Sequence, residues 1–218
     1  MSTHLIACEM LRDEMELAME RTGIAYPTIW LDKGLHKTPE SLRAALMDKM
    51  SQLEKYDTIL LGLALCGGAL DGVSCAHARI AVPRFDDCIR MLLSTEPGLR
   101  NAADARSLYY TPQWLESNGH ITMERQEYIE RYGEKKARKI MRLMLANYKH
   151  YRMVETGAYD PAEWEERARA DAAELNLEYG TQPGTVRVLE KLLRQEFDEE
   201  FLVVGPGEQL TQRMFLDI

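Results

Sequence analysis

Hydrophobic and polar positions along this chain follow two alternating periods. Short apolar runs that suit buried strands occur at residues 4–7, 26–31, 57–65, 79–82, 107–111, 151–155 and 201–204. Between them, apolar residues recur every three or four positions, which is typical of helices with one buried face. Such helices are expected at residues 11–21, 39–53, from 88 onward, at 122–148 with a break near Gly133, at 161–175 and at 185–195.

The alternation of strands and helices predicts an α/β fold. Residues 58–65 read TILLGLAL, a nearly unbroken apolar run of the kind found in parallel sheets that are covered on both faces. We therefore expect an open, mainly parallel, Rossmann-like sheet with helices on both faces. Residues 1–218 are interpreted as a single domain. A division into two α/β halves, near residues 117–150, stays open.

Composition and charge exclude several classes of partner. The formal net charge of −8 argues against nucleic acid, which is bound by clustered Lys and Arg. No run of about 18 apolar residues is present, so no membrane span is expected. The first residues lack the features of a signal peptide, which indicates a cytoplasmic protein whose four cysteines are free thiols or ligands. A homodimer is the default assembly.

Three cysteines follow predicted strands, and they are the main candidates for chemistry. Cys8 follows the first strand, Cys66 the most hydrophobic one, and Cys88 the strand that stops at Pro83. The carboxyl ends of parallel strands lie along one edge of a sheet, where ligands bind, so the three thiols can meet in space. We expect them to hold a metal ion.

The residues next to these cysteines suggest further roles. Gly67 and Gly68 let the backbone approach a ligand closely. Cys88 is expected in the first turn of a helix, where the backbone dipole favours a thiolate. The carboxylates expected to act as acid or base beside the cysteines are Asp86, Asp87 and Glu9. Substrate contacts are expected from Gly67, Gly68, Arg84, Tyr110 and Trp114.

Several chemistries fit this pattern, and the sequence does not separate them. Three thiolates could hold zinc with an open fourth position, or a [4Fe–4S] cluster in an enzyme of the dehydratase or synthase kind. Facing cysteines could also work without a metal as acid and base. A non-enzymatic metal-binding accessory protein is a further alternative. Free cysteine is, in addition, often a small buried hydrophobe. Cys75 and His77 form a weaker candidate pair in a loop.

These motifs resemble those of the domain-of-unknown-function family numbered 1638, known from methanogens and other mostly anaerobic prokaryotes. The resemblance rests on Cys8-Glu9, on Leu65-Cys66-Gly67, on Asp86-Asp87-Cys88 and on the segment from Tyr109 to Trp114. Gly68 replaces an asparagine of the family pattern, and Gln113 replaces a glycine.

The resemblance implies a place in one-carbon metabolism, because family members are often linked to corrinoid proteins and their methyltransferases. It therefore implies a small-molecule substrate, a corrinoid protein as a partner, and a metal-dependent transferase or lyase if the chain is an enzyme. Methyl transfer to a thiol would suit zinc, which activates thiolates.

Overall fold

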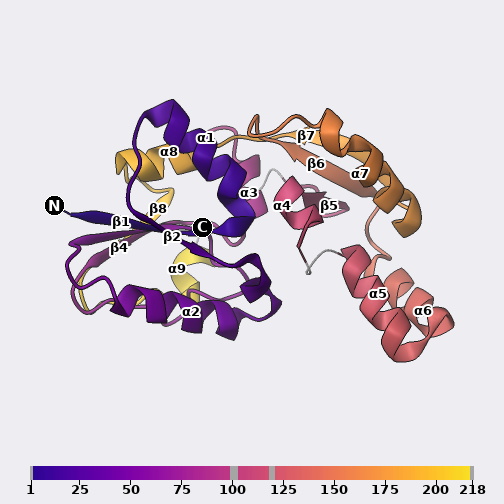
Figure 1. The fold of residues 1–218 in the computed structure, drawn as a ribbon, viewed down its shortest axis with the longest axis horizontal. Helices are drawn as coiled ribbons and strands as arrows, with labels where there is room; N and C mark the ends of the chain where they lie inside the picture. The colour runs from indigo at the N-terminus through magenta and orange to yellow at the C-terminus, as the bar shows by residue number, and fades with distance from the viewer. Residues whose placement is uncertain (1, 99–102, 118–120, 217–218) are drawn as a thin grey trace.

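Two β-sheets form the framework of the molecule (Figure 1). The computed structural model describes residues 2–98, 103–117 and 121–216. The larger sheet has the strand order β2-β1-β3-β4-β8 and the smaller one the order β5-β6-β7. The strands of the larger sheet are β1 (Thr3–Cys8), β2 (Thr28–Leu31), β3 (Thr58–Gly62), β4 (Arg79–Pro83) and β8 (Phe201–Val204). Those of the smaller sheet are β5 (Ser107–Tyr110), β6 (His150–Glu155) and β7 (Glu178–Pro183).

The predicted α/β fold with mainly parallel sheets is confirmed. β1 pairs in parallel with β2 and β3, β3 with β4, and all pairs of the smaller sheet are parallel, whereas β8 runs antiparallel to β4. The helices are α1 (Arg12–Thr22), α2 (Pro39–Ser51), α3 (Cys88–Leu93), α4 (Pro112–Leu115), α5 (Ile121–Tyr132), α6 (Glu134–Met144), α7 (Ala162–Leu175), α8 (Arg187–Arg194) and α9 (Gln212–Leu216). Two short 3₁₀ helices, η1 (Glu9–Leu11) and η2 (Lys33–Lys37), follow β1 and β2.

Helices cover both faces of the larger sheet, α1 and α8 on one side and α2 and α9 on the other (Figure 1). The start of α2 follows from its sequence: the Thr38 hydroxyl accepts a hydrogen bond from the Ser41 amide, and Pro39 occupies the first turn. Leu42, Leu46 and Met50 then share its buried face. The three central strands β1, β3 and β4 are almost wholly buried between these layers, as expected for a sheet covered on both sides.

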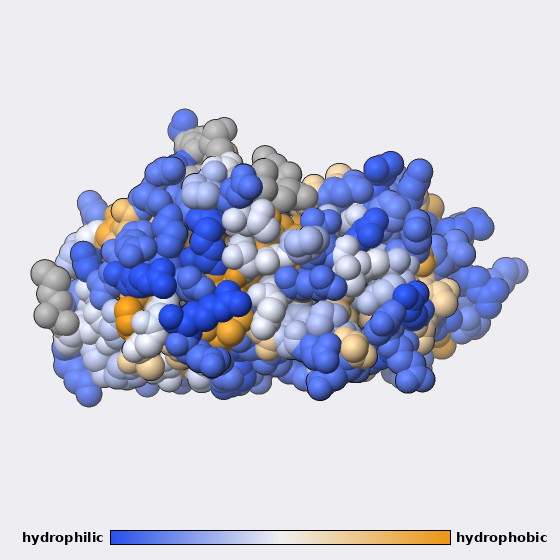
Figure 2. Space-filling view, turned by 90° about the horizontal axis from the view of Figure 1, so that it is seen from above, coloured by the Kyte–Doolittle hydropathy of each residue, from blue (hydrophilic) through white to orange (hydrophobic). Residues whose placement is uncertain are grey.

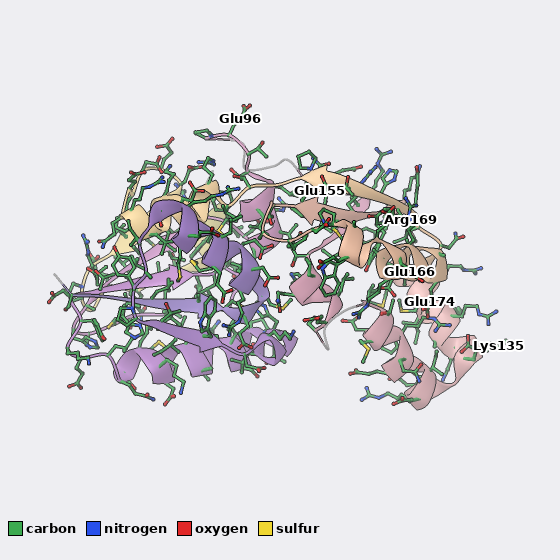
Figure 3. All side chains as sticks on the ribbon, turned by 45° about the horizontal axis from the view of Figure 1, so that its top comes forward. Glu96, Lys135, Glu155, Glu166, Arg169 and Glu174 are labelled. Atoms are coloured by element: carbon green, nitrogen blue, oxygen red, sulfur yellow. The ribbon has the colours of Figure 1, made fainter. Side chains whose placement is uncertain are left out.

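The smaller sheet has its own apolar cluster, built around Tyr110, Tyr151 and Met153 and covered by α7. The outer side of α7, away from the smaller sheet, carries Glu166, Arg169 and Glu174 (Figure 3). Hydrophilic side chains also dominate the face shown in Figure 2, where apolar atoms reach the surface in small areas. Each sheet thus has an apolar cluster of its own, and the single domain over residues 1–218 stays a prediction.

The sequence analysis missed β7. Its residues, Glu-Tyr-Gly-Thr-Gln-Pro, have no continuous apolar face, because β7 is an edge strand whose residues are all exposed or only partly buried. The predicted strand 57–65 also ends earlier than expected, at Gly62, and the buried residues 63–65 continue as a loop. Within the described residues, every helix is too short or too polar to traverse a lipid bilayer.

A buried carboxyl group lies where α1 approaches the segment after β6. Glu14 of α1 is 0 % exposed, and its Oε1 accepts a hydrogen bond of 3.4 Å from the Thr156 hydroxyl. Its Oε2 has no hydrogen-bond partner among the described residues. Burial raises the pKa of Glu14 from the usual 4.5 to about 8, and the nearby charge of Asp13 adds to the rise. The folded chain therefore keeps this group neutral at pH 7.

Glu14 should make the protein less stable as the pH rises. Between pH 4.5 and about pH 8, Glu14 keeps a proton in the folded chain that it releases in the unfolded chain. The free energy of unfolding therefore has its full contribution from Glu14 below pH 4.5 and loses it progressively up to about pH 8. We expect the free energy of unfolding of the wild type to fall by up to about 1.4 kcal/mol per pH unit in this window, relative to Glu14→Gln. Urea unfolding at several pH values measures the difference.

The control for this experiment is Glu20→Gln, since Glu20 lies on the same helix and is exposed. It should follow the wild type at every pH. Parallel stability curves for the wild type and Glu14→Gln would show that Glu14 is ionised in the folded state.

Candidate functional site

After each of four parallel strands, one cysteine or histidine lies at the same edge of the larger sheet. β1 lies between β2 and β3 in the sheet. The chain runs from β1 to β2 on one side and then returns to β3 on the other side, so the strand order reverses at β1. Such a switch point opens a crevice outside the strand ends. Cys8 ends β1, His36 lies in η2 after β2, Cys66 lies in the loop after β3, and Cys88 begins α3 after β4.

Backbone hydrogen bonds bring Cys66 and Cys88 together. The amides of Leu65 and Cys66 donate to the carbonyls of Phe85 and Asp86, each over 3.0 Å, so the loops after β3 and β4 continue side by side beyond the sheet. The two sulfur atoms, Sγ of Cys66 and Sγ of Cys88, are 3.6 Å apart.

The backbone at Cys66 is strained. Its φ of 47° lies in the left-handed region, which costs a residue with a Cβ atom of order 1 kcal/mol, and Gly67 follows with a φ of 67°. Gly67 tolerates this conformation because it has no Cβ. The turn holds the Cys66 thiol toward Cys88 and leaves Cys66 partly exposed, whereas Cys8 and Cys88 are buried.

Cys8 is paired with His36, a residue that the sequence analysis missed. The Cys8 Sγ and the His36 Nε2 are 2.8 Å apart, and the same sulfur accepts a hydrogen bond of 3.4 Å from the Met10 amide. The signal for His36 was present in the sequence, because it follows a strand just as the three cysteines do. A search for possible ligands after every predicted strand, including the one at residues 26–31, would have included His36.

Burial holds the site in its neutral form. It raises the pKa of Cys8 to about 12, and the nearby thiol of Cys66 adds to the rise. Burial also lowers the pKa of His36. Burial therefore keeps both members of this pair neutral, a thiol beside an uncharged imidazole.

Cys88 begins α3 as predicted, but the prediction that its thiolate is favoured there is wrong. The hydrogen bond to Cys66 raises the pKa of the Cys88 thiol well above its usual value, with burial and the nearby Cys66 and Cys8 thiols acting in the same direction. The fold brings all three thiols into one region, because Cys66 and Cys88 are in contact and line the same pocket as His36, which contacts Cys8.

The three candidate carboxylates differ in position. Asp87 caps α3, accepting a hydrogen bond of 2.7 Å from the Arg90 amide, and burial raises its pKa. Asp86 forms an ion pair with Arg90 at 3.2 Å, and Glu9 forms one with Arg12 at 2.9 Å. Of the three, Asp87 lines the adjoining pocket.

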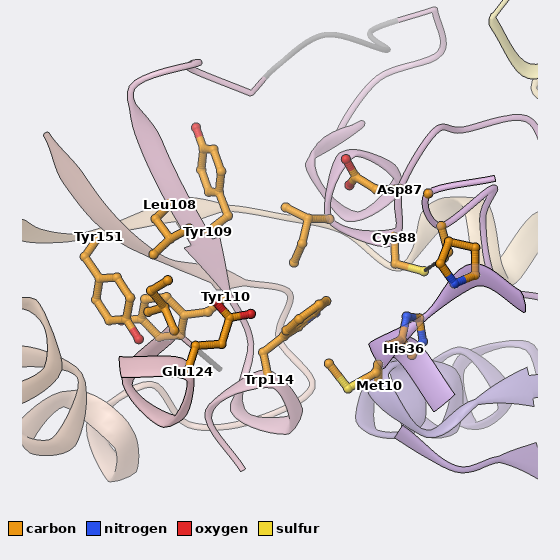
Figure 4. Close-up of a pocket in the computed structure, with 15 residues that line it drawn as sticks. Met10, His36, Asp87, Cys88, Leu108, Tyr109, Tyr110, Trp114, Glu124 and Tyr151 are labelled. Carbon is orange, nitrogen blue, oxygen red and sulfur yellow. Dashed lines mark hydrogen bonds between the residues drawn. The ribbon is translucent and has the colours of Figure 1, made fainter. Parts of the chain in front are cut away.

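A pocket of about 540 Å³ adjoins the thiols and extends to the smaller sheet (Figure 4). Its wall at the larger sheet consists of Met10, His36, Pro39, Cys66, Gly67, Asp87, Cys88 and Ile89. The rest of its wall consists of Leu108, Tyr109, Tyr110, Trp114, Ile121, Glu124 and Tyr151. Gly67, Tyr110 and Trp114 thus lie where substrate contacts were expected.

Two predicted substrate contacts lie outside this wall. The Gly68 carbonyl accepts a hydrogen bond of 2.7 Å from Nη2 of Arg43. Arg84 is directed to α9, where its Nε donates to the Met214 carbonyl over 2.7 Å. Glu124 of α5 also lines the pocket and was not predicted, because nothing in the sequence around it indicates a neighbour in another layer.

The metal site itself stays a prediction. Across residues 2–98, 103–117 and 121–216, no group of three or more His, Cys, Asp or Glu side chains stands in an arrangement ready for a metal ion. The four strand-end groups instead form two pairs, Cys8 with His36 and Cys66 with Cys88. The Cys75 sulfur lies 3.5 Å from Nε2 of His77 in a separate loop, and neither residue lines the pocket.

Comparison with known protein families identifies the family of this chain. The family described as protein of unknown function, DUF1638, matches residues 30–193. The chain belongs to this family. No curated protein and no solved structure matches the sequence. The DUF1638 match covers His36, Cys66, Cys88 and every other residue of the pocket wall except Met10, while Cys8 precedes it.

The thiols of this DUF1638 protein should differ sharply in reactivity when no metal is bound. Cys66 is partly exposed, whereas Cys8, Cys75 and Cys88 are buried, and burial favours the unreactive thiol form. We expect iodoacetamide at pH 8 to label Cys66 at least about tenfold faster than the other three. Peptide mapping by mass spectrometry measures the four rates, with the urea-unfolded chain as the control for equal labelling. Labelling of Cys8 as fast as that of Cys66 would contradict the described burial.

Proposed function

We propose that this DUF1638 protein is a cysteine-ligated metalloprotein, and that it is an enzyme acting on a small molecule bound in the adjoining pocket. The observation that carries the proposal is the convergence of Cys8, His36, Cys66 and Cys88, one from each of four parallel strands. Sulfur and imidazole nitrogen are the donors that zinc prefers in proteins.

The charge of the site supports a cation there. None of the pocket residues given above is Lys or Arg, and the pKa of the Cys8 thiol is raised to about 12. Buried thiolates need a nearby positive charge, and a metal ion supplies it by displacing the thiol protons. The same observation disfavours the metal-free alternative, because cysteines acting as acid and base need pKa values near the working pH.

The separation of the sulfur atoms favours a single metal ion over a cluster. Two thiolates bound to one tetrahedral zinc at about 2.3 Å each stand about 3.8 Å apart. The Cys66 and Cys88 sulfurs are 3.6 Å apart. Cysteines of a [4Fe–4S] cluster bind different iron atoms, so their sulfurs stand much farther apart. Zinc is therefore the leading candidate and the cluster the alternative.

His36 would act as the fourth ligand or as a partner of Cys8. Sulfur and nitrogen bound to one zinc stand about 3.6 Å apart, so η2 must move outward from the present 2.8 Å contact for both to bind. Zinc supplies Lewis acidity and keeps its thiolates deprotonated. The pocket beside the thiols favours an enzyme over an accessory protein, which would need only an exposed binding site.

The finer parts of the function rest on the family resemblance alone. Methyl transfer, a corrinoid partner protein and one-carbon metabolism are proposals to be examined after the metal. Within the pocket, Asp87 is the carboxylate best placed to exchange a proton with a substrate, because burial raises its pKa and it lines the wall beside Cys88.

Metal content tests the proposal. We expect the protein purified without oxygen to contain about one zinc per chain, and Cys66→Ser to lose it, because a hydroxyl is a far weaker zinc ligand than a thiolate. His36→Gln should weaken zinc binding, by about 10- to 100-fold if His36 is a supporting group. Elemental analysis and competition with a chelator measure both effects.

Cys75→Ser is the matched control, since Cys75 is also a buried free thiol but lies outside the pocket wall. It should keep its zinc. A brown protein with iron and sulfide would select the cluster instead. Absence of any metal, or equal metal in Cys66→Ser and the wild type, would refute the proposal.

A further inference from the structure

The sulfur atoms of Cys66 and Cys88 are in direct contact. Their Sγ atoms are 3.6 Å apart, and a disulfide bond of about 2.05 Å would require them to approach by about 1.6 Å. The loops that carry them already lie side by side, because the Cys66 amide donates a hydrogen bond of 3.0 Å to the Asp86 carbonyl. Rotation of the two side chains can therefore supply the approach without a rearrangement of the fold.

The other two thiols have different neighbours. The Cys8 sulfur lies 2.8 Å from Nε2 of His36, and the Cys75 sulfur lies 3.5 Å from Nε2 of His77 in a separate loop. Within the part of the chain that the structure describes, Cys66 and Cys88 are thus the two thiols best placed to react with each other.

An oxidant can reach this pair through the pocket. Both cysteines line the cavity of about 540 Å³, where Cys88 lies at the same end as His36 (Figure 4). Cys66 is partly exposed, whereas Cys88 is 5 % exposed. A thiol attacks as its thiolate, which contact with water stabilises. Cys66 is therefore suited to attack an oxidant, and Cys88 to attack Cys66 afterwards.

We propose that Cys66 and Cys88 form a reversible disulfide when a hydroperoxide reaches the pocket, and that this oxidation and metal binding compete for the same two sulfur atoms. The disulfide follows from the geometry of the chain alone. The competition rests on the proposed function, because it applies only if the thiolates hold a metal ion. Oxidation then removes two of the proposed ligands at once, and the oxidised chain releases its zinc.

The reaction with hydrogen peroxide takes two steps. The Cys66 sulfur attacks one peroxide oxygen, so an S–O bond forms and the O–O bond breaks. The hydroxide that leaves takes up the proton lost by the Cys66 thiol and becomes water. The Cys88 sulfur then attacks the sulfenic acid of Cys66: the S–S bond forms, the S–O bond breaks, and the second hydroxide takes the Cys88 proton as water.

The two sulfur atoms together supply the two electrons that reduce the peroxide. Cys88 needs no access to solvent for its step, because its target is the neighbouring sulfur and the reaction is intramolecular. A dithiol such as dithiothreitol reverses the modification by thiol–disulfide exchange and is itself oxidised to a cyclic disulfide.

Peptide mapping after peroxide treatment tests the disulfide. The full chain is purified without oxygen, freed of metal with a chelator, treated with hydrogen peroxide at pH 7.5, alkylated while unfolded and examined by mass spectrometry. We expect one disulfide, between Cys66 and Cys88, which dithiothreitol reduces completely. Free thiols at both positions, or a bond from Cys66 to Cys8, would overturn the proposal.

Cys75→Ser is the matched control. No Lys or Arg lies between Cys66 and Cys75, so trypsin leaves both on the peptide of residues 56–79, and the variant assigns the bond to Cys66. It should form the disulfide at the rate of the wild type. A bond to Cys88 that is lost in Cys75→Ser would overturn the proposal.

Two further variants test the roles of the two thiols. Cys88→Ser should stop at the sulfenic acid of Cys66, which dimedone traps. Cys66→Ser should consume peroxide at least about tenfold more slowly than the wild type, because the buried Cys88 thiol is left without its partner. Equal rates in Cys66→Ser and the wild type would show that Cys66 is not the attacking thiol.

Zinc added before the peroxide separates this inference from the metal proposal. We expect it to slow disulfide formation at least about tenfold, and the oxidised chain to keep no zinc after gel filtration. Zinc that stays bound to the oxidised chain would overturn the competition. A disulfide in a chain that binds no zinc when reduced would support the disulfide and refute the metal proposal with its competition. Bound zinc, together with free thiols in the peroxide-treated metal-free chain, would do the reverse.

Discussion

The parallel pairing of β1 with β3, and of β3 with β4, is the constraint on which the rest of the site depends. Parallel strands end along one edge, so residues separated by dozens of positions arrive at the same place. The pairing continues into the loops, where the Cys66 amide donates to the Asp86 carbonyl over 3.0 Å. This bond sets the distance between Cys66 and Cys88, and its cost is the left-handed backbone at Cys66.

Burial then limits what these thiols can do. A thiol removed from water loses its tendency to ionise, and neighbouring thiols oppose a second negative charge. The neighbouring thiols add to the effect of burial on the pKa of Cys8 and Cys88, and burial also lowers the pKa of His36 beside Cys8. Without a cation, the buried thiols of Cys8 and Cys88 are therefore unreactive toward reagents in solution. With a divalent ion the same burial strengthens the bond between metal and thiolate, because water competes less well.

The sequence predicted those parts of the structure that follow from local periodicity. The α/β order and the convergence of three cysteines both depend on which residues end a strand, and apolar runs mark those ends. β7 escaped prediction because an edge strand needs no apolar face. The charge state of Cys88 escaped it because burial and a neighbouring thiol outweigh a short helix. Glu124 reaches the pocket from another layer, and no local pattern encodes that distance.

Residues from both sheets' surroundings line the pocket, and Gln113 connects the two parts. Gln113 of α4 donates to both carboxylate oxygens of Asp13 at 3.1 Å, and its Oε1 accepts from Nζ of Lys33 at 3.4 Å. α4 also carries Trp114, whose ring lies 6.1 Å from that of His36. A glycine at position 113 could make none of these side-chain bonds. In this chain Gln113 therefore holds α4 and its Trp114 against α1 and η2, so this part of the pocket wall keeps its position beside the thiols.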